Sequence, residues 1–409
     1  YKVVYIKVVN LVVLNMKLRL VAAALVAVCL SSYAQNAENN FRITGKVTNV
    51  PDSAVVRLLR PLSKVVETIV ADTICDGSFT LTGNVNDGNN ILYLIVDGRG
   101  FPNRFSKIVV FPGAEINITG DGVLYPLWTV ESPSPLQESI TAVTASQMPE
   151  FEEALKYSIE ETDLMYYIYV ENKGAEEVER ETWKKINALR KKSAPCNSIV
   201  DAKKLAYMAT APIDDIWLYE CLNLVDMLRN NPDRSDAEMI LGLTNRIDDE
   251  QYATKYGKRI KALMSIDGNL KTGDVMPHAE FVDVDGKTHD LSEFEGKSIL
   301  LDFWSAGCGP CVMSFAEAEE VATKYADKLA FVSVSQDEAH IWKEALDRYK
   351  LNGIQWNGYR DEGVMVFDKF GNMGIPFYVF ITPDGVIKNV WTGYGEGYLM
   401  RKVDSLMKD

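Results

Sequence analysis

The sequence predicts a multidomain protein: an N-terminal antiparallel β-sandwich, a helical connector and a C-terminal α/β domain. The chain has 409 residues, more than one ordinary hydrophobic core holds. Short runs of alternating apolar and polar residues fill its first part, and helix-forming residues fill the middle. In the last third, strand-like runs alternate with helical ones. We expect domains at residues 35–135, 136–270 and 271–409, after a targeting segment at residues 1–34.

The targeting segment has the three parts of a signal peptide. After Met16, the expected initiator, Lys17 and Arg19 supply positive charge, residues 20–30 are apolar, and residues 32–34 form a small-residue cleavage site. Polar and charged residues interrupt the apolar stretch, which disfavours the alternative of a membrane anchor. We expect an exported protein of the periplasm or cell envelope that is soluble after signal cleavage.

The expected β-sandwich rests on short strand-like runs separated by turn signals. The runs lie at residues 41–44, 55–59, 78–81, 91–96, 108–111 and 116–118. This part resembles the small β-domain at the N-terminus of many exported thioredoxin-like proteins of the Bacteroidetes group. The resemblance rests on the F-x-I-x-G start at Phe41, the Asp76–Gly77 turn and Pro112–Gly113 before the last run.

The middle of the chain is rich in Ala, Leu, Glu, Lys and Met and predicts long helices. They are expected at residues 150–170, 175–192, 200–229 and 235–264, with breaks at Gly174, Pro195 and Pro232. The aromatic run at residues 165–169 is expected to pack in a core. We see no catalytic or metal-binding pattern in this region and interpret it as a connector.

The net charge of -14 excludes two classes of partner. Nucleic acids and anionic membranes attract basic surfaces, and this chain is acidic.

Among the cysteines, only one pair has a spacing typical of redox-active dithiols. Cys75, Cys196 and Cys221 are isolated in the sequence and are expected as small buried residues, with a bridge between the last two as the alternative. Cys308 and Cys311 form a C-x-x-C that follows an apolar run and opens a helical one.

This placement predicts different roles for the two sulfur atoms. The unpaired amides and dipole of a helix N-terminus stabilise a thiolate, the form that attacks disulfides, so Cys308 is the expected nucleophile. Cys311 falls on the apolar stripe of the helix and is expected to lie buried, where it resolves the mixed disulfide. Half of a zinc site is the alternative, but a structural zinc needs four ligands and the sequence offers no second pair.

The run from Ser298 to Cys311, with its W-x-x-x-C-G-P-C, resembles thioredoxin. Residues 271–409 as a whole resemble the exported thioredoxin-like reductases related to cytochrome c maturation. The resemblance implies a thioredoxin fold. It also implies a cis Pro376 that faces the dithiol, with the backbone of Ile375 pairing with the client chain. The remaining substrate-binding residues that it implies lie around the dithiol: Trp304, Gly309 and Pro310.

Asp302 lies inside the apolar run before the dithiol. An unpaired carboxylate in such a place is costly, so its pKa should rise, and such an acid near Cys311 can take and return its proton. One position departs from the exported family. Many members carry Glu three residues after the second cysteine, and here that position is Ser314. Glu317 and Glu319 are expected to be solvated.

These features predict an exported thiol-disulfide oxidoreductase that reduces client disulfides, with no cofactor beyond the redox-active pair. The expected partners are disulfide-containing client proteins and an envelope electron donor such as a membrane thiol reductase. Two alternatives stay open: a partner-binding or assembly protein of the cell envelope with an incidental dithiol, and a thiol peroxidase. A peroxidase pattern requires proline where this chain has Leu301.

Overall fold

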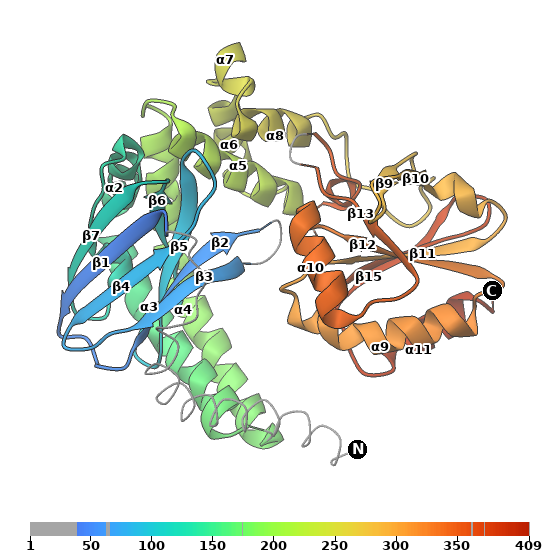
Figure 1. The fold of residues 1–409 in the computed structure, drawn as a ribbon, viewed down its shortest axis with the longest axis horizontal. Helices are drawn as coiled ribbons and strands as arrows, with labels where there is room; N and C mark the ends of the chain where they lie inside the picture. The colour runs from blue at the N-terminus through green and yellow to red at the C-terminus, as the bar shows by residue number, and fades with distance from the viewer. Residues whose placement is uncertain (1–38, 63–65, 174, 361–362, 372, 409) are drawn as a thin grey trace. The chain divides into compact units, whose positions relative to one another are not determined.

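The computed structural model describes residues 39–408 except 63–65, 174, 361–362 and 372 (Figure 1). The predicted targeting segment lies outside the described residues. Within the part of the chain that the structure describes, none of the helices combines the length and hydropathy that a membrane span needs.

The described residues of the N-terminal part form two four-stranded sheets, with strand orders β4-β1-β7-β8 and β3-β2-β5-β6. One hydrophobic core contains side chains from both sheets, among them Ile43, Leu58 and Ile116, so the sheets pack face to face as a sandwich. The strands are β1 (Phe41–Thr48), β2 (Val55–Pro61), β3 (Val66–Thr73), β4 (Ser78–Gly83), β5 (Asn90–Asp97), β6 (Ser106–Val110), β7 (Ala114–Asp121) and β8 (Thr129–Glu131).

The predicted antiparallel arrangement is wrong at one pair of strands. β1 pairs with β7 in parallel, with Ile43 opposite Ile116, whereas the other pairs of this sandwich are antiparallel. A parallel neighbour needs a long crossover, and here the chain passes through the second sheet between the two strands. The short alternating runs predict strands but carry no information on this crossover.

Strands β3 and β8 were missing from the sequence prediction. β3 lies at the edge of its sheet, and none of its residues is fully buried. It carries the charged residues Glu67 and Asp72 beside apolar ones, as expected for a half-exposed edge strand. β3 therefore lacks the run of buried apolar residues by which a strand is recognised in the sequence.

The middle region is helical, as predicted, but its boundaries differ. Pro195 lies inside one long helix, α4, which packs along α3 and stays buried on both sides of the proline, at Leu189 and Val200. The helices are α2 (Pro135–Ser146), α3 (Glu150–Tyr166), the π-helix η2 (Tyr167–Glu171), α4 (Glu176–Met208), α5 (Asp215–Asn230), α6 (Ala237–Thr244), α7 (Asp249–Tyr252) and α8 (Lys255–Met264). A proline costs a helix about 3 kcal/mol, and packing offsets that cost here.

Two further expectations for this region are wrong. The predicted helix at residues 200–229 is broken before α5, where the Asp214 side chain accepts a hydrogen bond from the backbone N–H of Trp217, 2.8 Å away. The aromatic run does not pack in a core: Ile168 is buried, but Tyr167 and Tyr169 are exposed.

The described residues of the C-terminal part form a mixed seven-stranded sheet in the order β10-β9-β13-β12-β11-β14-β15, which confirms the predicted α/β class. Leu300 and Leu301, neighbours on the inner strand β11, belong to hydrophobic cores on opposite faces of the sheet. The strands are β9 (Glu280–Val282), β10 (Thr288–Asp290), β11 (Ser298–Trp304), β12 (Leu329–Ser335), β13 (Ile354–Asn357), β14 (Phe377–Ile381) and β15 (Ile387–Thr392).

Helices flank this sheet (Figure 1). Val321 and Val403, from α9 and α11, share one core with Leu300, and Phe367 of the short helix η4 lies in the other. The helices are α9 (Gly309–Lys324), α10 (Ala339–Tyr349) and α11 (Tyr398–Leu406), with the short 3-10 helices η3 (Leu291–Phe294) and η4 (Phe367–Phe370).

Candidate active site

The dithiol lies where β11 passes into α9. Cys308 is the N-cap residue of α9, and its Sγ accepts a hydrogen bond from the backbone N–H of Cys311 at 3.2 Å. Pro310 stands in the first turn, where its missing N–H costs nothing and its fixed φ suits the helix. Cys308 and Cys311 are joined by a disulfide bond. The strand thus delivers the first sulfur to the helix terminus, as the sequence pattern predicts.

The two sulfur-bearing residues differ in access to solvent. Cys311 is completely buried, whereas Cys308 retains 6% of its surface and lies between the exposed Gly307 and Gly309. A partner molecule can therefore reach only Cys308. The predicted burial of Cys311 is confirmed.

A cis peptide bond joins Ile375 and Pro376 beside the disulfide. The carbonyl oxygen of Ile375 lies 3.7 Å from the Sγ of Cys308. Pro376 is buried, Ile375 is partly buried and Gly374 is exposed, so an accessible stretch of backbone approaches the dithiol. The cis bond and the proximity agree with what the family resemblance implied for these two residues.

Asp302 lies in the middle of β11, with 1% of its surface exposed. Neither carboxyl oxygen has a hydrogen-bond partner among the described residues. Burial raises the pKa of Asp302 to about 7. Tyr378, its opposite neighbour on β14, is also buried, and desolvation together with the nearby Asp302 raises the pKa of its phenol. The predicted unpaired acid is thus present in the strand that leads to the dithiol.

Trp304 and Ser314 are two further buried residues near the dithiol. The indole of Trp304 is fully buried and packs edge-on against Phe315, at 5.2 Å between ring centroids. Its ring has no free surface to offer a client, so its predicted contact with substrate is not supported, and it packs the site instead. Ser314 is buried, and its hydroxyl donates to the carbonyl of Cys311 at 2.7 Å.

Two acidic residues of this domain have contacts or burial that the sequence did not predict. Glu317 was expected to be solvated, but its carboxylate accepts hydrogen bonds from the backbone N–H groups of Gly397 and Met400. Asp337 is fully buried just beyond β12, the parallel neighbour of β11. Asp337 lies two residues after β12, and only the pairing of β12 with β11 shows which loop it meets.

The remaining described cysteines are free. Cys221 is buried and Cys196 is partly buried, but Cys75 is exposed, against expectation. The Cys196–Cys221 bridge is absent among the described residues. Cys75 lies in the turn before β4, where its backbone pairs with that of Ser78 in an isolated antiparallel β-bridge.

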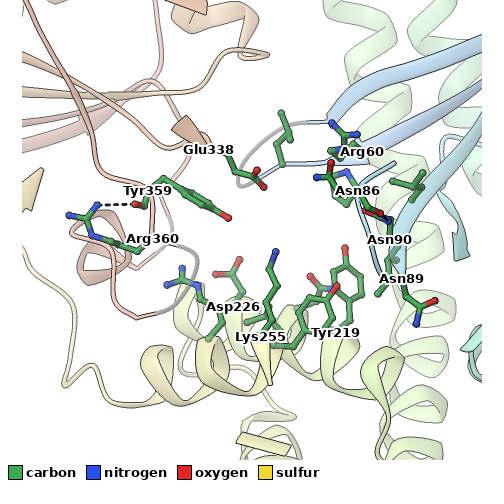
Figure 2. Close-up of a pocket in the computed structure, with 18 of the residues that line it drawn as sticks. Arg60, Asn86, Asn89, Asn90, Tyr219, Asp226, Lys255, Glu338, Tyr359 and Arg360 are labelled. Carbon is green, nitrogen blue, oxygen red and sulfur yellow. Dashed lines mark hydrogen bonds between the residues drawn. The ribbon is translucent and has the colours of Figure 1, made fainter. Parts of the chain in front are cut away.

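A separate cavity of about 540 Å³ has a largely polar lining. Figure 2 shows Tyr219, Asp226 and Lys255, from α5 and α8, with their polar ends directed into it. No cysteine is among the described residues that line it.

Three comparisons relate the C-terminal part to known proteins. Residues 271–404 match the family model described as Redoxin. A thiol-disulfide oxidoreductase ResA from Halalkalibacterium halodurans is 29% identical over 113 residues, 27% of this chain and 62% of that protein. The ResA of Bacillus thuringiensis is 26% identical over 139 residues, 32% of this chain and 79% of that protein.

Among solved structures, a thiol:disulfide interchange protein from a Bacteroides species is 26% identical. The match covers 34% of this chain and 92% of that one, with a TM-score of 0.31. A putative thiol-disulfide oxidoreductase from Bacteroides vulgatus is 28% identical over 33% of this chain and 96% of that one, with a TM-score of 0.29. With the Redoxin match, the sequence likenesses identify the C-terminal part as thioredoxin-like and related to thiol-disulfide oxidoreductases.

Proposed function

We propose that this protein is an exported thiol-disulfide oxidoreductase that reduces disulfide bonds of client proteins through Cys308 and Cys311. The observation that carries the proposal is the disulfide at the start of α9, with one sulfur accessible and the other buried. The similarity of residues 271–404 to Redoxin and ResA sequences supports the same reaction class.

The reduced dithiol acts in two steps. The thiolate of Cys308 attacks one sulfur of the client disulfide, which forms a mixed disulfide and releases one client thiolate. The thiolate of Cys311 then attacks the Sγ of Cys308, which restores the internal disulfide and releases the second client thiolate. Two electrons pass from the dithiol to the client, and an external dithiol donor must return them.

Asp302 serves as the proton carrier for Cys311. Its carboxyl group has a pKa of about 7, so near neutral pH both of its protonation states are populated. The carboxylate takes the proton of the Cys311 thiol before the second attack, and the proton passes on to the departing client thiolate. Burial of both groups keeps bulk water from replacing the acid.

The client chain lies against the backbone of Ile375, beside Cys308. The carbonyl oxygen of Ile375, 3.7 Å from the Sγ of Cys308, and the exposed Gly374 support this placement, and Gly309 and Pro310 beside Cys308 are also exposed. The clients are proteins with disulfide bonds, and a membrane thiol reductase of the envelope serves as donor. The signal-like residues 1–34 support export, and residues 35–135 and 136–270 serve to place the C-terminal domain or to bind a partner.

Insulin reduction tests the reaction. The protein without residues 1–34, supplied with dithiothreitol, should accelerate the precipitation of insulin, and Cys308→Ser should abolish the acceleration. Cys75→Ser is the matched control, because this cysteine is free and exposed and should leave the rate unchanged. Equal rates for the wild type and Cys308→Ser would remove the proposed activity.

Trapping tests the identity of the clients. Cys311→Ser removes the resolving sulfur, so mixed disulfides on Cys308 should accumulate in cells and separate on non-reducing gels. Cys308→Ser/Cys311→Ser should trap nothing. Failure of the single variant to trap any protein under oxidative conditions would argue against a client-directed role.

A further inference from the structure

Asp337 occupies a buried position beside the loop that leads to Cys308. It follows β12, and β12 pairs in parallel with β11, so that Trp304 lies opposite Ser335 at the ends of the two strands. The backbone N–H of Gln336 donates to the carbonyl of Trp304 at 2.9 Å. The strand register therefore brings Asp337 to the first residues after β11.

The carboxylate of Asp337 binds this loop directly. The hydroxyl of Ser305 donates to Oδ1 at 2.5 Å, and the backbone N–H of Ala306 donates to Oδ2 at 2.7 Å. Ser335 adds a third bond to Oδ2 at 3.0 Å. Asp337, Ser305 and Ser335 are fully buried, so water does not compete for these bonds.

Further hydrogen bonds fix both Asp337 and the loop residue Ala306 that it binds. Asn357 donates to the backbone carbonyl of Asp337 at 2.8 Å, which fixes the acid from the side of β13. The hydroxyl of Tyr349 on α10 donates to the carbonyl of Ala306 at 3.1 Å. Ala306 is thus held at both its N–H and its carbonyl, two residues before the nucleophile.

The chemistry of Asp337 differs from that of Asp302. Burial raises the pKa of Asp337, and hydrogen bonds from Ser305, Ala306 and Ser335 oppose that rise. Three donors surround its oxygens, a pattern that suits the ionised form. Asp302 has no such donors among the residues described and is suited to proton exchange instead.

We propose that Asp337 is a positioning residue for the dithiol: its carboxylate fixes the loop of residues 305–307 and, through it, the place of Cys308 at the start of α9. This inference rests on the proposed dithiol chemistry. Asp337 does not touch the reacting sulfur atoms. Its influence on them is geometric, through the loop, and electrostatic, through a negative charge held at Ala306, two residues before Cys308.

Asp337→Asn tests the electrostatic influence of Asp337 on the dithiol without removing its hydrogen bond to the loop. Asparagine has the same shape, and its carbonyl oxygen can still accept the N–H of Ala306, so the loop stays tied while the charge is lost. Loss of a nearby negative charge favours the thiolate of the reduced form. The equilibrium between protein and dithiothreitol should move toward the reduced dithiol by about threefold to tenfold, which corresponds to roughly 15–30 mV.

The control is Glu320→Gln, which removes one negative charge from an exposed position of α9 and should leave the equilibrium unchanged. No shift in Asp337→Asn, a shift toward the disulfide, or an equal shift in Glu320→Gln overturns the proposal. This measurement needs no client protein, so it fails or succeeds independently of the insulin assay.

Ser305→Ala tests the hydrogen bond between Ser305 and Asp337 directly. It also tests the positioning role if Asp337→Asn does not fold. It removes one of the three hydrogen bonds but keeps the charge. Disulfide exchange with insulin should slow by about threefold while the dithiothreitol equilibrium stays within twofold of the wild type, because one buried neutral–charged hydrogen bond is at stake. A wild-type exchange rate in this variant overturns the positioning role.

Discussion

Asp302 on β11 and Glu220 on α5 are almost equally buried, with exposures of 1% and 3%, yet their pKa values move in opposite directions. Burial raises the pKa of Asp302 to about 7. Burial also acts to raise the pKa of Glu220, but Lys107 and Lys204 overcome this effect and hold the pKa at about 2. Both lysines form ion pairs with its carboxylate, Lys107 at Oε1 and Lys204 at Oε2.

The two pKa values differ because Glu220 has charged partners and Asp302 has none within the described part of the chain, not because one carboxyl group is more deeply buried. A buried carboxylate with two ammonium groups is a structural element of the fold, because its charge is compensated. A buried carboxyl group without a partner destabilises the fold whenever it ionises and gains a proton affinity that is useful near neutral pH. Burial alone therefore does not identify a catalytic acid in this protein.

The largest expected effect is on the pH dependence of stability through Asp302. Its raised pKa means that the folded protein binds this proton more tightly than the unfolded chain does. The resulting stabilisation is fully present below about pH 4 and is lost as the pH rises through about 7. Over this window, the free energy of unfolding of the wild type should fall by up to about 4 kcal/mol relative to Asp302→Asn.

Urea denaturation of both proteins from pH 4 to pH 8 measures this difference. Parallel stability curves for the wild type and Asp302→Asn would show that the carboxyl group does not titrate in this range and would remove its proposed role in proton transfer.

Glu220 should show the opposite sign and a somewhat smaller effect. Its lowered pKa contributes stability that is present above about pH 4.5 and lost as the pH falls toward 2. At pH 7, Glu220→Gln should lower the free energy of unfolding by about 2 kcal/mol, because two partly buried lysines lose their counter-charge. Disulfide exchange at Cys308 should stay unchanged.

Glu181→Gln is the matched control for this variant. Glu181 forms an exposed pair with Lys184 on the surface of α4, and its loss should change stability by less than about 0.5 kcal/mol. If the two glutamate variants were equally stable, the cluster around Glu220 would have no special structural role.

The smallest effect in energetic terms is on catalysis. Asp302→Asn should slow insulin reduction at pH 7 by about tenfold, equivalent to about 1.4 kcal/mol in the barrier, because Cys311 loses its proton acceptor. The loss should shrink as the pH is raised, since hydroxide then deprotonates the thiol directly. A variant with full activity at pH 7 would assign proton transfer to another group.

Around the C-terminal dithiol, the local sequence pattern and the tertiary structure agree. A buried strand, a short loop and a helix N-terminus place Cys308 and Cys311 without reference to the rest of the chain. Asp302 was identifiable because a charged residue in an apolar run is a conspicuous exception. Asp337 was not, since its role arises from the pairing of two strands that are distant in sequence.

The other parts were predicted less well, for reasons that involve packing. Pro195 normally ends a helix, but contacts with α3 hold α4 together, including one between Cys196 and the carbonyl of Glu150. The break before α5 could have been found, since Pro212 disfavours continuation of the preceding helix and Asp214 is a typical N-cap residue. The parallel pairing of β1 with β7 has no local signal at all.

That parallel pairing has a consequence for the order in which the sandwich can be completed during synthesis. β1 lies between β4 and β7, and its register with β7 joins residues about 73 positions apart, as in the hydrogen bond from Thr44 to Asn117. β1, the first of the described strands, therefore keeps one edge open until β7 has been made. Such long-range closure is slow compared with a hairpin, and a nascent chain that stops before Ala114 still exposes the edge of its first strand.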